Sequence, residues 1–411
     1  MSGIGPLVGS APVRVLDVAP ARVFPPRRGM NVRIAALGRE LSRRHEVRHL
    51  TLAADGRVRR RGMTRRDLSS SQSELQRVHP LSSLVMRASA RSWHEAPVLA
   101  GLGMRAAEPA VMADQFSWAD VVLVEFPWQF RLSRALTPRD TPCVYSSLNI
   151  ETDKFRSWAK AVDVPPARAA PWLRYIHRAE RNAVANADLV TTVSELDRDG
   201  FIDRFGADPA RTVVVPNGVD TQRFRPATTG ERAAARAELG LPDRPVVLFQ
   251  GANMPANFAG LEWVRRLAAV DGRFTYLVAG SVAEPERSEH MVVAGPVPDM
   301  APYLAAADLG VCPIAYGGGT KLKLLECMAA GLPTVAFAGG IRGTTARDGE
   351  HVVVVPPDEV RLLDALASLV DDPVAGGRLG TAARELAERS YDWGVIASGL
   401  EEALVDLTRV S

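Results

Sequence analysis

The chain has 411 residues, of which 46% are hydrophobic and 24% are charged. This balance is typical of a water-soluble globular protein and excludes the disordered, collagen-like and membrane-spanning classes. The length exceeds what one ordinary hydrophobic core organises, so we expect two domains. The net charge of only +3 gives no reason to expect a nucleic-acid partner.

The N-terminus and the cysteines indicate the compartment. Residues 1–12 lack a basic stretch followed by a long apolar core, so we expect a flexible tail without a signal peptide. Cys143, Cys312 and Cys327 are odd in number and widely spaced, which indicates neither a disulfide framework nor a metal site. These features favour a reducing compartment, and we predict a cytoplasmic protein.

From residue 13 onward the chain alternates strand and helix patterns. A strand over 13–18, a loop with Gly29, a helical run over 32–44 and a strand over 46–52 are typical of the first unit of a doubly wound sheet. Further strands are predicted at 120–125, 142–147, 189–193 and 212–216. We therefore assign residues 13–216 to an N-terminal Rossmann-like domain.

A basic run from Arg57 to Arg66 interrupts this series and leads into a polar region over 67–114. Neither stretch has a clear apolar period, so we expect a solvated loop followed by outer helices. The alternative is a peripheral contact between this run and the inner face of a membrane.

The second half repeats the α/β alternation. Strands are predicted at 245–251, 274–280, 292–296, 309–313, 334–337 and 351–356, with helical patterns between them. We assign residues 217–390 to a second Rossmann-like domain, and residues 391–411 contain a final helical run. The fold class is therefore α/β with two doubly wound domains.

The most informative stretch, Tyr316–Phe337, joins a glycine loop to a helix and a strand. Thr320 is expected to cap the helix, and Gly331 is expected to end it in a left-handed conformation. Backbone amides and the positive end of the helix dipole then point into the loop, which suits a phosphate. Lys321 and Lys323 in the first turn oppose the dipole, which an anionic ligand would explain. The alternative is an ordinary β-α-β crossover with a solvated charged face.

Three segments resemble the retaining glycosyltransferases of family 4, which have the GT-B fold. They are Tyr316–Phe337, the Pro-Asn-Gly-Val-Asp segment within 216–226, and Tyr391-Asp-Trp393. The resemblance implies that the two Rossmann-like domains face each other across a cleft. It also implies that the C-terminal segment, residues 391–411, returns to the first domain.

The resemblance further implies roles for particular residues. Glu326 would bind the ribose of a nucleoside diphosphate sugar, and Lys321 and Lys323 would assist departure of the diphosphate as catalytic residues. The remaining donor-binding residues would be Gly251, Asn253, Asn257, Gly318, Gly319 and Thr320. The acceptor side of the cleft would contain Gly29, Arg33, Asn149 and Glu151.

Several positions depart from the family pattern. The first glutamate of the family's Glu-x7-Glu motif is Gly318 here, and the usual arginine and lysine that hold the diphosphate are Ala252 and Asn257. A subgroup with Gly-Gly-Thr-(Lys/Arg)-x-Lys and a Pro-x-Asn loop shares these changes. The family's His-Asn-x-Glu strand end is present as Asn149 and Glu151, but Leu148 replaces the histidine.

The implied reaction is transfer of a sugar from a UDP- or GDP-sugar, with retention and without a metal or cofactor. The acceptor would be a glycan, a lipid-linked saccharide or a small natural product. Asp197-Arg-Asp199 spells the metal motif of the other main glycosyltransferase fold, but it lies in a predicted helix. Two alternatives are a nucleotide-sugar epimerase on the same fold and a non-catalytic protein that binds a nucleotide-sugar or a partner.

Overall fold

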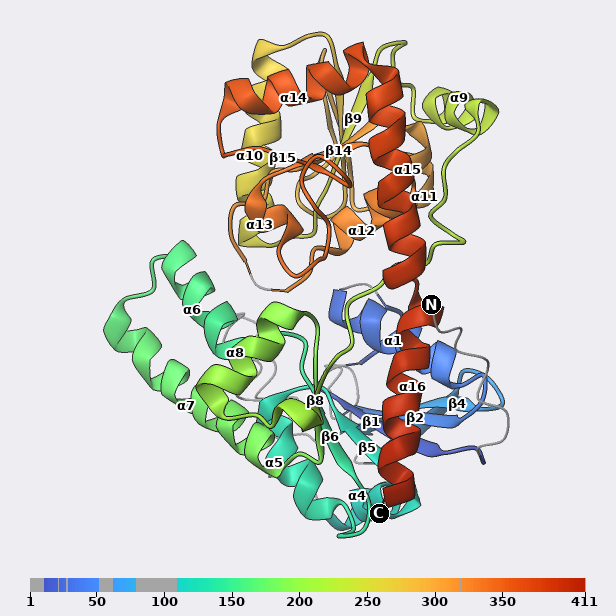
Figure 1. Ribbon diagram of the computed structural model, residues 1–411, viewed down its shortest axis with the longest axis vertical. Coiled ribbons are helices and arrows are strands. Elements are labelled where there is room, and N and C mark those ends of the chain that lie inside the picture. Colours follow the sequence, from blue (N-terminus) through green and yellow to red (C-terminus); the bar gives the residue numbers. More distant parts are fainter. Residues whose placement is uncertain are drawn as a thin grey trace. The chain divides into compact units, whose positions relative to one another are not determined.

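The computed structural model describes residues 11–20, 22–26, 29–51, 62–78, 109–317 and 319–410. The chain divides into two compact units. The first contains Met1–Phe155, Pro166–Val215 and Ile396–Ser411, and the second contains Arg156–Pro165 and Pro216–Val395. Each unit contains one sheet, and each is described here by itself (Figure 1).

The first sheet has eight strands in the order β3-β4-β2-β1-β5-β6-β7-β8. Their bounds are β1 Arg14–Ala19, β2 Glu46–Thr51, β3 Gly62–Asp67, β4 Gln72–Val78, β5 Val121–Val124, β6 Cys143–Ser146, β7 Leu189–Thr192 and β8 Thr212–Val214. Every pairing is parallel except that of β3 with β4. The chain winds outward from β1 in both directions, so the strand order reverses between β1 and β5, as in a doubly wound sheet.

The helices of this half connect successive parallel strands (Figure 1). They are α1 Gly29–Leu41, α4 Pro109–Trp118, α5 Pro127–Leu136, α6 Glu151–Ala161, α7 Pro166–Asn186 and α8 Glu195–Phe205, with a short 3₁₀ turn, η1, at Pro209–Arg211. Helix α8 is capped by Ser194, whose hydroxyl accepts a hydrogen bond from the Asp197 amide.

Two expectations for the first half were wrong. Helix α1 begins at Gly29, so this glycine is the first helical residue and not part of the preceding loop. Residues 62–78 form the β3–β4 hairpin, where a loop and outer helices were predicted. The hairpin escapes detection because β3 is an exposed edge strand and β4 buries the polar residues Gln72, Ser73 and Glu74, so neither strand shows apolar alternation.

The basic run is only partly described. Arg65 and Arg66 lie exposed on β3, whereas the part of the run before Gly62 lies outside the described residues. Most of the predicted tail over 1–12 also lies outside them. In the part of the chain that the structure describes, every helix is too short or too polar to cross a bilayer.

The second sheet has seven strands in the order β11-β12-β10-β9-β13-β14-β15. Their bounds are β9 Val246–Gln250, β10 Thr275–Ala279, β11 Glu286–Arg287, β12 Met291–Gly295, β13 Leu309–Cys312, β14 Thr334–Ala336 and β15 Val353–Val354. All pairings are parallel except that of β11 with β12. The central strands are buried along their whole length, which explains their continuous apolar sequences.

The helices of the second half alternate with its strands up to β15, and three consecutive helices then end the chain. They are α9 Thr229–Glu238, α10 Pro255–Val270, α11 Ala301–Ala306, α12 Leu322–Ala329, α13 Ala338–Ile341, α14 Glu359–Asp371, α15 Pro373–Ser390 and α16 Trp393–Val410. Gly331 follows α12 with φ of 65°, which confirms the predicted left-handed helix end.

The final helix, α16, joins the first unit from Ile396 onward. Its buried face includes Leu400 and Leu404. Glu401 lies 3.2 Å from the guanidinium of Arg44 and 3.1 Å from Nε2 of His45, both just after α1. Apolar burial and this ion pair therefore attach the end of the chain to the unit in which it began.

Candidate functional site

The glycine loop and α12 of the second unit form the core of the candidate site. The loop follows β13, and Gly317 and Gly319 have φ of 115° and 68°, which L-residues with side chains rarely adopt. Gly318 lies between them, outside the described residues. Helix α12 then begins with Lys321 as its N-cap residue, without a hydrogen bond from its side chain to the first-turn amides.

Thr320 does not cap α12, contrary to the prediction. Its hydroxyl donates to the Gly343 carbonyl at 3.1 Å. The threonine therefore holds the glycine loop against the segment after α13 instead of satisfying the helix. With no side-chain cap on Lys321, the first-turn amides of α12 keep the anion-binding character of a helix N-terminus.

The side chain of Lys323 extends from α12 to the first turn of α10, which follows the loop after β9. Its Nζ lies 2.5 Å from Oδ1 of Asn257 and 4.9 Å from the ring centroid of Phe249. Burial lowers the pKa of Lys323. Asn257 in turn donates to the Ala252 carbonyl at 2.8 Å. The ammonium of Lys323 therefore lies beside position 257, where the family pattern has its own lysine.

Lys321 takes a different direction from the same turn. Its Nζ donates to the carbonyls of Gly317 at 3.3 Å and Gly319 at 2.8 Å. The two ammonium groups therefore contact different segments, because Lys321 is the extended N-cap residue of α12 and Lys323 lies within the helix. Lys321 donates hydrogen bonds to carbonyls of the glycine loop. Lys323 brings a positive charge to the first turn of α10.

Glu326 lies one turn further along α12 and is half-buried. Burial raises the pKa of its carboxyl group to about 7, against the opposing influence of Lys323, Arg223 and a hydrogen bond from Gln250. Gln250 also donates to the Lys323 carbonyl at 3.1 Å. The sequence analysis did not select Gln250. Gln250 could have been selected because it is the one polar residue of β9 and ends that strand.

The loop after β9 requires close backbone approach. A Cβ atom on Gly280 would lie 2.3 Å from the Gly251 carbonyl oxygen, so the residue after β10 must be a glycine. The Asn253 amide donates to the Ser281 hydroxyl at 3.1 Å. A Cβ atom added to Gly317 would lie 3.8 Å from the Cβ of Ala256, in the first turn of α10.

These contacts bring most of the predicted donor-binding residues together on two adjacent segments. The first, the loop after β9 with the first turn of α10, contains Gly251, Asn253 and Asn257, and the second, the glycine loop with α12, contains Gly319, Thr320, Lys321, Lys323 and Glu326. The segments meet at the contact between Lys323 and Asn257. The result is a site with two lysines, a half-buried carboxylate and uncapped helix amides.

Arg33, predicted for the acceptor side, is buried in the first unit. Its guanidinium donates to the Val215 carbonyl at 2.7 Å, and burial lowers its pKa to about 10 against the opposing charges of Glu125 and Asp17. Gly29 begins the same helix four residues earlier, in sequence. A contact of either residue with an acceptor stays a prediction.

Asn149 and Glu151 follow β6 and contact each other. The Asn149 amide donates to Oε1 of Glu151 at 3.1 Å, and Nζ of Lys154 lies 3.3 Å from the same carboxylate. Leu148, in place of the family's histidine, packs in an apolar cluster with Phe126 and Trp128. At this position the side chain therefore has a packing role, and the strand end presents a carboxylate and an amide.

The sequence analysis missed a buried cluster of ionisable side chains in the first unit, formed by Asp17, His49 and Glu125. Nδ1 of His49 lies 2.8 Å from Oδ2 of Asp17. Burial raises the pKa of Glu125 well above its usual value, and the negative charge of Asp17 is the second largest cause of this increase. The detectable signal was the presence of charged residues within or directly after apolar strands.

Asp197 serves as part of a helix cap. The Ser194 hydroxyl contacts Oδ2 of Asp197 at 3.0 Å, within the first turn of α8. Across the described ranges, His, Cys, Asp and Glu side chains form no group of three or more that could hold a metal ion. Asp197 therefore has a capping contact in α8, and the metal-free mechanism stays a prediction.

Comparisons with known proteins agree in both halves of the chain. Residues 27–223 match the family model described as Glycosyltransferase Family 4. Residues 244–372 match the model described as Glycosyl transferases group 1. These matches support the chain's membership of glycosyltransferase family 4. The finer subgroup suggested by the glycine loop stays a prediction.

A curated relative and two solved structures are similar to the chain. The D-inositol 3-phosphate glycosyltransferase of Kineococcus radiotolerans is 32% identical over 256 residues, which are 54% of this chain and 58% of that protein. The sucrose-phosphate synthase of Thermosynechococcus elongatus has a TM-score of 0.76 at 19% identity, with 97% of this chain and 100% of that chain covered. Anabaena HepE in complex with UDP and glucose has a TM-score of 0.66 at 15% identity, with 95% and 99% covered.

These likenesses define what is established. The structural similarity over almost the whole chain shows the GT-B fold. The chain spans less than two thirds of the length of the first four curated relatives. The donor, the acceptor and the stereochemistry therefore belong to the proposal that follows.

Proposed function

We propose that the protein transfers a sugar from a nucleoside diphosphate sugar to an acceptor hydroxyl, with retention of the anomeric configuration. The observation that carries the proposal is the contact between Lys323 and Asn257. It brings an ammonium group beside position 257, where the family pattern has a lysine for the diphosphate and this chain has Asn257. The charge needed by the leaving group is therefore supplied from α12.

The other residues of the site have complementary chemistry. The uncapped amides of α12 and the glycine loop suit the phosphate oxygens, because a helix N-terminus attracts negative charge. The Glu326 carboxylate can accept hydrogen bonds from two ribose hydroxyls. As the bond to the sugar breaks, charge develops on the diphosphate, and fixed cations and amides stabilise it without reorganisation.

The comparisons support a nucleotide-sugar donor. The relative from Kineococcus radiotolerans is named as a D-inositol 3-phosphate glycosyltransferase, and the Anabaena structure contains UDP and glucose. We propose UDP- or GDP-sugars as donors, and a glycan, a lipid-linked saccharide or a small natural product as the acceptor. The absence of the family's two cations at Ala252 and Asn257 is the main argument for a non-catalytic role. That role is less favoured, because Lys323 supplies a cation beside Asn257.

A donor panel tests the proposal. Thermal unfolding is measured with UDP-, GDP- and dTDP-sugars, because a ligand that binds the folded state raises the unfolding temperature by mass action. One nucleotide series is expected to stabilise the protein, and slow release of free sugar from that donor is expected without an acceptor. Stabilisation without any sugar release or transfer would favour the non-catalytic role, and no stabilisation by any nucleotide would overturn the proposal.

The predicted membrane contact can be tested on the whole protein, and the cytoplasmic location stays a prediction. Sedimentation with vesicles containing anionic lipids, compared with neutral vesicles, measures whether the basic run Arg57–Arg66 attaches the protein to a membrane surface. We propose such a contact only if the acceptor proves to be lipid-linked.

A further inference from the structure

The glycine loop is restrained by a segment that follows α13. Thr320 donates to the Gly343 carbonyl at 3.1 Å, and Gly343 has φ of 79°. The next residue, Thr344, donates through its hydroxyl to the Ile341 carbonyl at 2.7 Å and accepts from the Ala346 amide at 3.3 Å. The segment is thus a compact turn whose outward carbonyl holds the loop.

The turn at residues 343–345 is hydrogen-bonded to Tyr391. The Thr345 amide donates to the Tyr391 hydroxyl at 2.7 Å, and the Thr345 hydroxyl lies 3.1 Å from the same oxygen. Tyr391 is only 3% exposed, and its backbone carbonyl accepts from the Val219 amide at 2.7 Å. Its ring and backbone are therefore fixed, and the hydroxyl presents a rigid anchor to residues 343–345.

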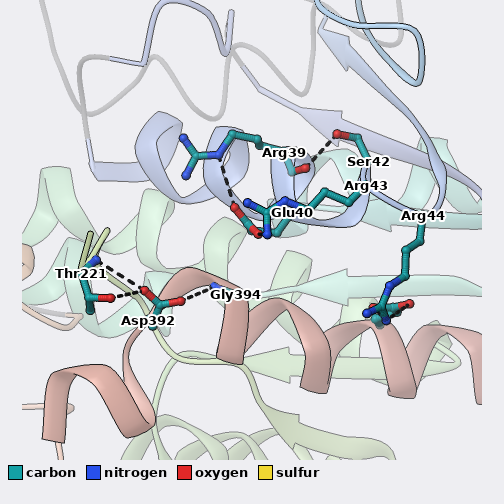
Figure 2. Close-up of polar contacts among 9 residues, drawn as sticks. Arg39, Glu40, Ser42, Arg43, Arg44, Thr221, Asp392 and Gly394 are labelled. Atoms are coloured by element: carbon teal, nitrogen blue, oxygen red, sulfur yellow. Dashed lines mark hydrogen bonds and ion pairs between the residues drawn. The ribbon is translucent and has the colours of Figure 1, made fainter. Parts of the chain in front are cut away.

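The neighbouring residue fixes the anchor further. Asp392 accepts from the Thr221 hydroxyl at 2.5 Å and from the Gly394 amide at 2.8 Å. Figure 2 shows these two contacts on opposite oxygens of the Asp392 carboxylate. Val219 and Asp392 also form an isolated β-bridge. Tyr391 therefore projects from a junction where two distant stretches of the second unit are joined.

We propose that the Tyr391 hydroxyl is a positioning group for the donor-binding glycine loop, acting through Thr345, Gly343 and Thr320. The inference rests on the proposed function. A loop built on glycines loses much conformational entropy when a ligand orders it. Restraint by a buried hydrogen-bond chain removes part of that cost before the donor arrives, which raises affinity. Among the four residues linked by these hydrogen bonds, only Thr320 needs to touch the donor.

Removal of the single oxygen tests the proposal. Tyr391→Phe keeps the buried ring and loses only the hydroxyl. Tyr276→Phe is the matched control, because Tyr276 lies on β10 of the same unit, is fully buried, and its hydroxyl has no hydrogen-bond partner in the structure described here. In the free protein, Tyr391→Phe is expected to speed amide hydrogen exchange in residues 319–323, whereas Tyr276→Phe leaves it unchanged.

Donor affinity provides the second readout. Tyr391→Phe is expected to raise the donor dissociation constant and KM by about 3- to 10-fold, the equivalent of one net hydrogen bond, with a smaller change in kcat. Tyr276→Phe is expected to leave both constants within about 2-fold, because it removes no hydrogen bond. Unchanged exchange and unchanged affinity in Tyr391→Phe would overturn the inference.

A double-mutant cycle distinguishes a connected chain from general destabilisation. Thr320→Val breaks the chain at its other end. If these hydrogen bonds act as one connected series, the double mutant has about the same donor dissociation constant as the single mutant with the lower affinity. If the two losses multiply, Tyr391 does not act through Thr320 and the inference fails. Faster loop exchange in Tyr391→Phe, together with wild-type protein that binds no nucleotide-sugar, would overturn the proposed function while the restraint of the loop stands.

Discussion

Lys323 and Lys321 lie two positions apart and have different surroundings. Lys323 contacts Asn257 across the site, whereas Lys321 contacts the carbonyls of its own loop. We therefore assign the larger role in leaving-group departure to Lys323. The charge of Lys323 reaches the neighbouring segment and can stabilise the diphosphate there. Lys321 already binds the carbonyls of its own loop, so we expect it mainly to support the structure of that loop.

The corresponding prediction concerns turnover. Lys323→Met is expected to lower kcat by about 10²–10³-fold with a smaller effect on donor affinity, because the contact strengthens as charge develops. Lys321→Met is the matched comparison and is expected to have the smaller effect on kcat. Steady-state kinetics with the donor identified by the panel measures both. Near wild-type turnover in Lys323→Met would remove this lysine from the proposed role.

Glu326 leads to a prediction about pH. Burial raises the pKa of Glu326 to about 7, and only the ionised carboxylate can accept from both ribose hydroxyls. Donor binding is therefore expected to tighten as pH rises through 7. Calorimetric titration between about pH 5.5 and 8.5 measures this, and Glu326→Gln is expected to bind more weakly and to lose the pH dependence. A Glu326→Gln variant with the wild-type pH profile would assign the titration to another group.

Stability is expected to depend on pH in the opposite direction. The pKa of Glu326 is raised in the folded protein relative to its ordinary value of 4.5. Its contribution to stability is therefore fully present below about 4.5 and is lost as pH rises through about 7. Donor binding and apo stability thus respond to the same titration with opposite signs, which separates a binding role from a purely structural one.

At the scale of elements, α12 depends on close packing against α15. A Cβ atom on Gly380 would lie 2.2 Å from the Gly331 carbonyl oxygen, at the end of α12. The end of α12 is also held by Arg384, whose guanidinium donates to the Ala329 carbonyl at 2.5 Å. The donor helix is therefore placed by its C-terminal contacts as well as by the glycine loop.

Two glycines of α15 provide a matched test of this packing. Gly380→Ala is expected to lower the free energy of unfolding by about 1–3 kcal/mol, because the added methyl group meets backbone that must shift. Gly377→Ala has open space around its Cβ position and is expected to raise it by up to about 1 kcal/mol through helix propensity. Urea denaturation measures both. Equal effects of the two substitutions would contradict the packing role of Gly380.

At the scale of the whole molecule, the metal dependence of turnover is the decisive property. We predict that the intact protein keeps its activity after EDTA treatment and dialysis, because the lysines and amides of the second unit supply the positive charge for the diphosphate. Transfer assays before and after chelation measure this. Activity that is lost with EDTA and restored by Mg²⁺ or Mn²⁺ would contradict the metal-free mechanism.

The sequence by itself determined the alternation of strands and helices, the two-domain α/β class and the helix end at Gly331. These features depend on local periodicity and on backbone preferences of single residues, which act over a few positions. The resemblance in the glycine loop then indicated GT-B, because that motif combines several such local features in a short stretch.

Only the tertiary structure decided which groups meet. Thr320 was a reasonable helix cap by local rules, but its hydroxyl binds Gly343, which is 23 residues away in sequence. The partner of Lys323, at position 257, is 66 residues away. Strand β4 was hidden because its buried side chains are polar and are satisfied by distant groups, as when Glu74 accepts from the Val23 amide. Such contacts depend on how the whole chain packs, and no short-range pattern encodes them.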